Sequence, residues 1–312
     1  SALGMRGVGS ALVTPPSVSV PPDEPAQVRS RLDALGLDGI FDVHTHFLPE
    51  RMLEKVWAYF DSAGPLTGRP WPIAYRHSEE GRLRALRELG VRHFSALTYP
   101  HKPGMAAWLN EWGAEFAADK PDCLHSATFY PEPGAGDYVR EAVAAGAQIF
   151  KAHVQVGDYD PNSPLLDPVW EALSELRTPL VIHSGHGPAP GRFTGPEGLE
   201  TLLARYPDLV LIVAHMGLPD YSRSLDLVEK YDGVHLDTTM AFTAFTEQNT
   251  PFPIEDLPRL RALGDRILFG SDFPNIPYPY LEAVDGVIGL GLGDEWTRGV
   301  LYGNAARLFR LT

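Results

Sequence analysis

The chain of 312 residues is acidic, with 26 Lys and Arg residues against 40 Asp and Glu residues and a net charge of −14. This charge argues against a nucleic acid or an anionic membrane as partner, because both repel an acidic surface. No apolar run reaches the ~18–20 residues that a membrane span needs, and no signal peptide is recognisable. The single cysteine, Cys123, allows no intramolecular disulfide. We therefore expect a globular protein of the reducing cytoplasm.

We expect the start of the chain to form an N-terminal extension that precedes the main domain. Residues 1–22 are rich in Gly, Pro, Ser and Val, which is typical of an extended tail. Residues 26–36 predict a short helix that ends at Gly36. The sequence thus divides into an N-terminal extension, residues 1–37, and one domain, residues 38–312.

The first strand expected in this domain, residues 39–44, leads into two histidines, His44 and His46. Side chains two residues apart on a strand share one face about 6.6 Å apart, so both imidazoles can approach one metal ion. Chance yields roughly 0.4 such pairs in a chain with 11 histidines, so the pair by itself is weak and equally fits a solvated strand end. Residues 47–76 follow as a long connection, whose aromatic side chains either wall a pocket or pack the loop.

From about residue 78 the sequence alternates between helical and strand-like segments. Including the first, eight strands are expected, each followed by a helix. The further strands are residues 91–99, 123–130, 147–154, 179–185, 209–217, 233–239 and 266–272. Near-continuous apolar strands are typical of a parallel sheet buried on both faces. The sequence therefore predicts an α/β fold, a (β/α)8 TIM barrel rather than an open doubly wound sheet.

Polar side chains stand where these strands end, and the carboxyl ends of barrel strands meet on one rim, where active sites lie. Beyond the first pair they are Tyr99, His101, Tyr130, Lys151, His153, His183, His215, Asp237 and Asp272.

Imidazole and carboxylate groups together suit zinc and similar divalent ions. We expect His44, His46 and His183 to supply nitrogen ligands. Asp272 can complete the set and accept a proton from a water molecule that the metal activates. His215 is better placed to polarise a substrate oxygen or to donate a proton.

Five segments in this order resemble the amidohydrolase superfamily: "DVHTHFLP", "VIHSG", "VAHMG", "LFGSDFP" and "LYGNAARLF". The resemblance covers roughly residues 38–311 and is strongest to the amidohydrolase-related branch, which includes metal-dependent hydrolases and aminocarboxymuconate-semialdehyde-type decarboxylases. It implies a distorted (β/α)8 barrel with one divalent metal ion, usually zinc. By motif, it implies the same ligands, His44, His46, His183 and Asp272, with His215 as the catalytic histidine of the sixth strand.

The fourth strand leaves several roles open. Lys151 invites a carboxylated lysine bridging two metals, as in dinuclear members of the superfamily, whereas related mononuclear members also carry a lysine there. Otherwise Lys151 is a positive charge near the substrate or part of an ion pair at the rim. His153 shares its face and is expected to line the pocket, so both are candidate substrate-binding residues. His101 and His186 lie in predicted loops, where a role as solvated surface residues is as plausible as a role in the site.

The sequence therefore predicts a metal-dependent hydrolase that uses a metal-activated water on an amide, lactone or ester of a small organic molecule. The alternative on the same site is a non-oxidative decarboxylase of an aromatic or enol-type carboxylic acid. That reaction needs cations for the substrate, and Arg51, Arg69, Arg76 and Arg192 lie in candidate rim loops. Two or more inward arginines would favour the decarboxylase. A non-catalytic barrel that binds a metal or ligand, and assembly into a homo-oligomer, also stay open.

Overall fold

The structure, a computed structural model, describes residues 18–62, 69–187 and 189–311. Most of the Pro-rich tail expected over residues 1–22 therefore lies outside the described residues. The strands are β1 (Ile40–Asp42), β2 (Val91–Phe94), β3 (Ser126–Thr128), β4 (Ile149–His153), β5 (Leu180–His183), β6 (Leu211–Val213), β7 (Val234–Asp237) and β8 (Ile267–Leu268). Each lies inside a strand that the sequence predicts.

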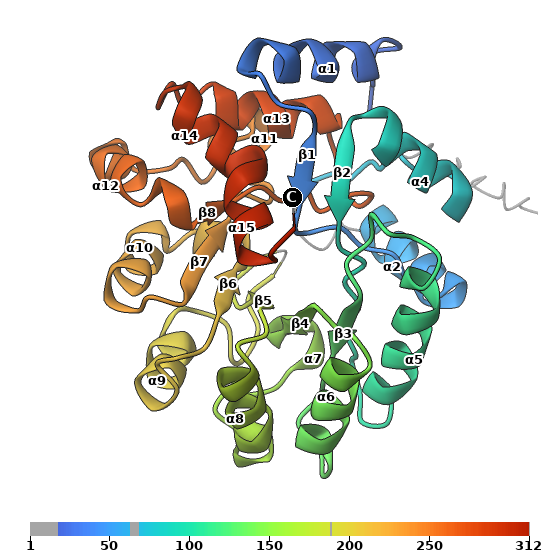
Figure 1. The fold of residues 1–312 in the computed structure, drawn as a ribbon, viewed down its shortest axis with the longest axis vertical. Helices are drawn as coiled ribbons and strands as arrows, with labels where there is room; N and C mark the ends of the chain where they lie inside the picture. The colour runs from blue at the N-terminus through green and yellow to red at the C-terminus, as the bar shows by residue number, and fades with distance from the viewer. Residues whose placement is uncertain (1–17, 63–68, 188, 312) are drawn as a thin grey trace, which may run out of the picture.

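The helices surround these strands on the outside (Figure 1). They are α1 (Glu24–Leu35), α2 (Glu50–Asp61), α4 (Glu79–Glu88), α5 (Ala106–Ala117), α6 (Ala135–Ala144), α7 (Val154–Gly157), α8 (Asp167–Leu176), α9 (Glu197–Arg205), α10 (Tyr221–Lys230), α11 (Ala244–Glu247), α12 (Leu257–Ala262), α13 (Tyr280–Ile288), α14 (Asp294–Arg298) and α15 (Asn304–Leu308). Among the described residues, none of these helices combines the length and apolar character that a membrane span needs.

The strands form a ring of parallel neighbours. β1 pairs with β2, and β3 to β8 pair in chain order. Backbone hydrogen bonds link the two groups on both sides: Leu124 N donates to Phe94 O (2.8 Å) beside β2, and Val43 N donates to Phe269 O (3.0 Å) beside β8. The ring with its outer helices confirms the (β/α)8 barrel, whose strands are apolar because both of their faces are buried.

The interior of the barrel is filled by apolar side chains, so it is a packed core and not a channel. Inward-facing residues such as Val181 and Ile212 are fully buried. The C-terminal segment closes one end, because Ala305 and Phe309 pack against this inner cluster. α15 and the C-terminus accordingly lie over the middle of the ring in Figure 1.

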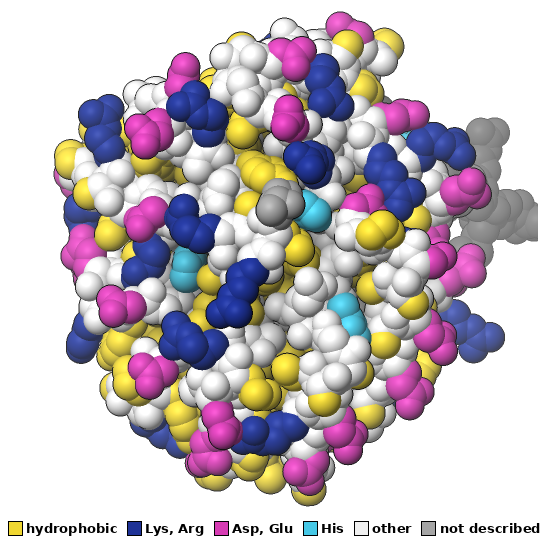
Figure 2. Space-filling model, in the orientation of Figure 1, with side chains coloured by type: hydrophobic (Ala, Val, Ile, Leu, Met, Phe, Trp, Pro, Cys, Tyr) yellow, Lys and Arg dark blue, Asp and Glu magenta, His cyan; other side chains and the backbone are white. Residues whose placement is uncertain are grey.

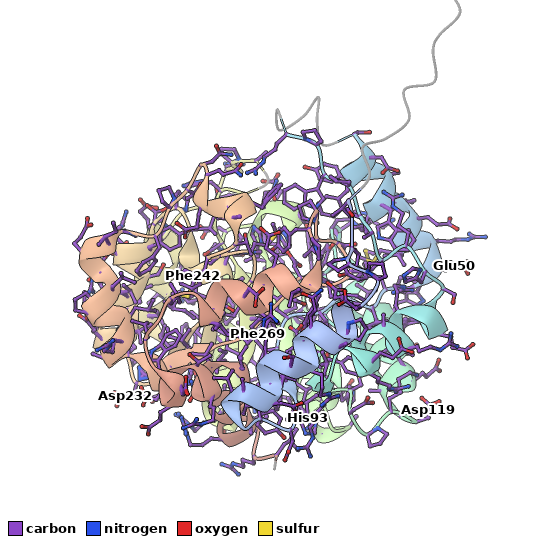
Figure 3. The ribbon with its side chains drawn as sticks, turned by 90° about the horizontal axis from the view of Figure 1, so that it is seen from above. Glu50, His93, Asp119, Asp232, Phe242 and Phe269 are labelled. Atoms are coloured by element: carbon purple, nitrogen blue, oxygen red, sulfur yellow. The ribbon has the colours of Figure 1, made fainter. Side chains whose placement is uncertain are left out.

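On the same face, acidic and basic side chains are interspersed (Figure 2). From above, Glu50, Asp119 and Asp232 lie at the periphery and Phe269 nearer the centre (Figure 3).

The connection after β1 differs from the expected long loop, because α2 occupies residues 50–61. Its apolar residues Leu53, Val56, Trp57 and Phe60 recur at helical spacing, a signal that the aromatic content of the segment obscured. Residues 63–68 lie outside the described part of the chain. The aromatic side chains of this connection divide between the two expected roles: some pack against the barrel and others reach the cavity described below.

Helix α1 is fixed to the barrel by a buried carboxylate. Glu24 Oε1 accepts a hydrogen bond from Tyr75 Oη (2.7 Å), and Oε2 accepts one from Leu281 N (3.1 Å). Tyr75 Oη in turn accepts from Tyr280 N (2.7 Å), so α1, the connection and α13 share one network. Burial raises the pKa of Glu24 above its ordinary value of 4.5, although these hydrogen bonds oppose the rise. The division of the chain at residue 37 stays a prediction.

Replacing Glu24 with glutamine is expected to flatten part of the pH dependence of stability. Because the pKa of Glu24 is raised in the folded state, its contribution is fully present below about pH 4.5 and is lost as the pH rises through the folded-state value. Urea unfolding at about pH 4 and pH 7 should show a smaller loss of free energy of unfolding in the variant than in the wild type. The control is Glu80→Gln, whose side chain is 87% exposed. An equal loss in wild type and E24Q would contradict the expectation.

Candidate active site

The side chains of the candidate site come from the ends of the strands and from the residues just beyond them. The strands are shorter than the sequence predicts, so His44 and His46 follow β1 rather than lying on it. His215 and Asp272 follow β6 and β8 and have φ angles of 59° and 72°. Such left-handed backbone is uncommon outside glycine and clusters at functional sites.

A buried aspartate joins the segments that carry the first histidine and Asp272. Asp42 Oδ1 accepts hydrogen bonds from His44 N and Ser271 N, both at 3.1 Å, and Oδ2 accepts from Tyr280 Oη at 2.8 Å. Burial raises the pKa of Asp42 to about 7, against the effect of these hydrogen bonds. The segments approach so closely that a Cβ at Gly270 would lie 2.8 Å from the Cβ of His44, which only glycine avoids.

Four histidines are oriented by one ring nitrogen each. In every case the partner is a carbonyl or carboxylate oxygen, so this nitrogen must carry the hydrogen when the ring is neutral. The pairs are His44 Nδ1 with Asp237 Oδ2 (2.9 Å), His46 Nδ1 with Leu97 O (3.0 Å), His183 Nε2 with Gly187 O (2.6 Å) and His215 Nδ1 with Thr239 O (2.9 Å). The other nitrogen of each ring is therefore left with a lone pair.

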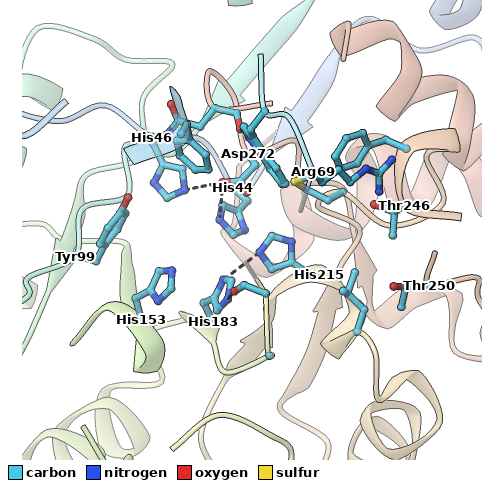
Figure 4. A pocket seen from close by; sticks show the side chains of 18 of the residues that line it. His44, His46, Arg69, Tyr99, His153, His183, His215, Thr246, Thr250 and Asp272 are labelled. Carbon is cyan, nitrogen blue, oxygen red and sulfur yellow. Dashed lines mark hydrogen bonds and ion pairs between the residues drawn. The ribbon is translucent and has the colours of Figure 1, made fainter. Parts of the chain in front are cut away.

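These lone-pair nitrogens converge with a carboxylate oxygen (Figure 4). His46 Nε2 lies 2.8 Å and His44 Nε2 lies 3.5 Å from Asp272 Oδ1. His215 Nε2 lies 3.1 Å from His183 Nδ1. One ligand atom from each of His44, His215 and Asp272 lies within 4.8 Å of the other two.

The convergence fits a divalent cation. Neutral imidazoles with their hydrogens directed outward present acceptors only, and a carboxylate adds another, so the atoms that face one another have no hydrogen between them. A cation placed among these acceptor atoms would remove their mutual repulsion. Nitrogen and oxygen donors of this kind suit zinc and similar first-row divalent ions. Outer hydrogen bonds to oxygen are also how metal-binding histidines are usually oriented.

The charges of the site agree with this picture. Burial lowers the pKa of His44 to about 4 and that of His183 well below its ordinary value, so both rings are neutral near pH 7. Burial alone would raise the pKa of Asp237, but the charge of His44 and its hydrogen bond hold it at about 2. His44 and His46 likewise lower the pKa of Asp272 against the effect of burial.

Lys151 stands on β4 with its amine directed at this cluster. The side chain is only 1% exposed, and Nζ lies 3.4 Å from His44 Nε2. Burial lowers the pKa of Lys151 to about 8, while the charges of Asp272 and Asp237 oppose the change. The lysine thus brings a hydrogen-bond donor to a site otherwise rich in acceptors.

The cluster opens into a cavity of about 390 Å³. Its lining contains the predicted site residues together with side chains from the α2 connection and from the segment around α11. The lining residues are His44, His46, Phe60, Arg69, Trp71, Tyr99, Lys151, His153, His183, Gly185, Gly187, His215, Leu218, Met240, Phe245, Thr246, Asn249, Thr250, Asp272 and Asn275. All seven site residues expected from the sequence as ligands, catalytic groups or substrate contacts are in this set.

Several rim residues considered from the sequence do not reach the cavity. His101, Tyr130 and His186 are absent from its lining. His186 instead bonds Thr194 Oγ1 through Nδ1 (2.8 Å). Of the four rim arginines, Arg69 alone lines the cavity as far as the structure describes the chain, and its Cζ lies 3.4 Å from the centre of the Phe245 ring.

Sequence reasoning missed two groups of functional side chains. Asp237 was named as a polar residue at a strand end, but its role in orienting His44 was not predicted. Asp42 was not singled out, although it lies two residues before His44 on the same face of the predicted strand. Phe245, Thr246 and Thr250 come from a polar segment with no motif, so nothing in the sequence singled them out. Trp71 is one of the aromatic residues of the connection over residues 47–76, and its Nε1 donates to Asn275 O (2.9 Å) beside the cavity.

Comparison with known proteins identifies the fold. The profile of the Amidohydrolase family matches residues 41–311. An uncharacterized TIM-barrel protein from Bordetella bronchiseptica superimposes with a TM-score of 0.71 at 19% identity, over 87% of this chain and 98% of that one. No curated protein matches the chain significantly.

Two further solved structures have named activities. A 5-carboxyvanillate decarboxylase from Novosphingobium aromaticivorans, with bound manganese, has a TM-score of 0.55 at 17% identity, over 88% of this chain and 99% of that one. A probable 2-pyrone-4,6-dicarboxylic acid hydrolase from Acinetobacter baumannii, with bound citric acid, has a TM-score of 0.56 at 14% identity, over 88% and 100%. At these low sequence identities, the similarity shows a shared fold and no more.

Proposed function

Because the chain belongs to the amidohydrolase family, whose members are metal-dependent enzymes, we propose that it hydrolyses an amide, a lactone or an ester of a small organic molecule. The observation that carries the proposal is a cluster of imidazole lone pairs at the wall of a cavity of about 390 Å³: those of His44, His46 and His215 lie beside the Asp272 carboxylate, and that of His183 lies beside His215. A cavity of that size suits a small-molecule substrate. We also propose the cytoplasm as its location, which the single, buried Cys123 supports.

For the metal we propose one zinc ion, held by His44, His46, His183 and Asp272. Such an ion, when bound, polarises a carbonyl oxygen and makes water more acidic. The protonation states support this set, because burial keeps His44 and His183 neutral while the neighbouring histidines keep Asp272 ionised, and these are the forms that bind metal. For Lys151 we propose a free amine, which lies 3.4 Å from His44 Nε2 and is a hydrogen-bond donor there, rather than a carboxylated lysine bridging two ions.

The proton steps fall to two side chains. Asp272 Oδ1, ionised and at the cavity wall, is the proposed acceptor of the proton of the attacking water. His215 donates from Nδ1 to Thr239 O, so its Nε2 can donate only after taking up a proton. We therefore propose that the proton taken from the water by Asp272 passes to Nε2 of His215, a residue close to Asp272, and that His215 then donates this proton to the leaving group. Lys151 Nζ is the proposed donor to the substrate oxygen that becomes negative.

Metal analysis and a substrate screen test the proposal. Purified protein loaded with zinc should bind one ion per chain and should add water to members of a panel of aryl esters, lactones and anilides. Carbon dioxide release from a parallel panel of hydroxybenzoates, without any hydrolysis, would replace the hydrolase with the decarboxylase. We rank the decarboxylase second because Arg69 is the one rim arginine that reaches the cavity within the described residues, where two or more would have favoured it. Activity that survives complete removal of metal would overturn both.

Replacing Arg69 with glutamine is expected to raise KM about tenfold for an ester that carries a carboxylate, such as 4-acetoxybenzoate. A hydrogen bond to a charged group contributes about 1.5–3 kcal/mol, and the ring of Phe245 holds the guanidinium at the cavity. KM for neutral phenyl acetate should change less than about twofold.

The matched control is Arg76→Gln. Arg76 lies in the same connection but pairs with Asp61 and is absent from the cavity lining. Equal changes for both esters in R69Q, or the same change in R76Q, would show that Arg69 does not contact the carboxylate.

A further inference from the structure

His153 differs from the other histidines of the cavity in the atom that it presents. It ends β4, and its Nδ1 accepts a hydrogen bond from Val156 N (3.2 Å) in the first turn of α7. A backbone N–H can only donate, so Nδ1 carries no hydrogen, and the neutral ring must carry its hydrogen on Nε2. His44, His46, His183 and His215 present lone pairs to the site, whereas His153 presents an N–H.

The ring of His153 is held rigidly at the cavity wall. It stacks on His183, with ring centres 4.0 Å apart and an angle of 12° between the planes. The ring of Tyr99 lies 5.2 Å away. With Nδ1 bonded to the backbone, rotation of the ring would break both the stacking and the cap of α7. Figure 4 shows His153 beside His183 and Tyr99, across the site from Arg69.

The N–H of Nε2 has no acceptor among the described residues, since the hydrogen bond of this ring in the structure is that of Nδ1. A rigid donor at the wall of a cavity, with no acceptor from the protein, is suited to a ligand atom. The His153 ring cannot bind a metal through Nε2, because Nε2 would first have to lose its hydrogen. The hydrogen cannot move to Nδ1, since Nδ1 accepts the hydrogen bond from Val156 N.

We propose that His153 is a specificity-determining residue that donates a hydrogen bond from Nε2 to an oxygen atom of the bound substrate. This rests on the proposed function only in that the substrate is a carbonyl compound bound in this cavity. The substrate then carries an acceptor oxygen, from a carboxylate, carbonyl or ether group, beside the reacting carbonyl and on the side of β4. A substrate with an N–H or an aliphatic group at that position leaves the donor of His153 unpaired and binds more weakly.

Nitrogen NMR of histidine-labelled, zinc-loaded protein tests the donor directly. His153, assigned by comparison with H153F, should show the Nε2-protonated tautomer, and adding benzoate should shift its Nε2 resonance and not that of His101, an exposed histidine outside the cavity. An Nδ1-protonated ring, or a ring insensitive to benzoate at concentrations that bind, would overturn the inference. Because this readout needs no turnover, a benzoate-induced shift in a protein that hydrolyses nothing would refute the proposed function and leave this inference standing.

Kinetics with a substrate from the screen supply the second test. His153→Phe keeps an aromatic ring for stacking but removes the donor, so kcat/KM should fall about tenfold, mainly through KM, with zinc content unchanged. His153→Gln places an amide N–H near the position of Nε2 and should recover activity to within about threefold of the wild type. His101→Phe is the control. Values for H153F within twofold of the wild type, or equal losses in H153F and H153Q, would count against a hydrogen bond to the substrate.

Discussion

Asp272→Asn is expected to lower kcat/KM at least a thousandfold, which corresponds to about 4 kcal/mol of transition-state stabilisation. The change removes a proposed metal ligand and the proposed proton acceptor together, and general-base catalysis alone is worth about 10²–10⁴. Asparagine is the right substitution because residue 272 has a φ of 72°, a conformation that asparagine adopts more readily than alanine. The fold should therefore survive.

The measurement is kcat/KM at saturating zinc, together with the bound zinc per chain and the circular dichroism spectrum. The control is Asp265→Asn, an exposed aspartate shortly before β8. If D272N binds zinc and keeps more than a tenth of the wild-type activity, Asp272 does not take the proton. If it keeps activity but loses zinc, the proposed role of the metal is wrong.

The barrel was predictable because its signals are local and repeated. Each apolar run, such as that of residues 209–213, fits a strand buried on both faces, and a polar residue such as His215 after it marks the rim. Parallel neighbours in chain order then bring residues 171 positions apart, His44 and His215, into one site. The exact strand ends were not predictable, because hydrogen bonding at the rim depends on loop conformation rather than on residue type.

The orientation of the histidines could not be derived from the sequence. That His46 Nδ1 meets Leu97 O, or that His183 Nε2 meets Gly187 O, depends on backbone carbonyls, which every residue possesses. The same applies to His153, whose tautomer is fixed by the N–H of Val156. The proposed ligand residues could thus be named from their types and order. The distinction between rings that present a lone pair and the ring that presents an N–H needed coordinates.

Asp237→Asn should lower zinc affinity about 10–100-fold, the usual cost of losing a partner that orients a metal-binding histidine. Asp237 Oδ1 accepts from His215 N and Thr239 N, both at 3.0 Å, and Oδ2 accepts from His44 Nδ1. An asparagine whose oxygen keeps the two backbone bonds directs its NH2 at His44. The ring must then accept at Nδ1 and carry its hydrogen on Nε2, which removes the lone pair from the site.

Asp42→Asn is a matched control, because Asp42 is equally buried and also receives two backbone N–H groups on one oxygen. Its other oxygen faces the Tyr280 hydroxyl, which can turn to accept from an amide, so zinc affinity should change less than about threefold. Titration calorimetry gives both affinities, and nitrogen NMR reports the tautomer of His44 in D237N. Equal affinity losses in D237N and D42N would mean that general destabilisation, and not the tautomer of His44, controls metal binding. Unchanged affinity in D237N would remove His44 from the ligand set.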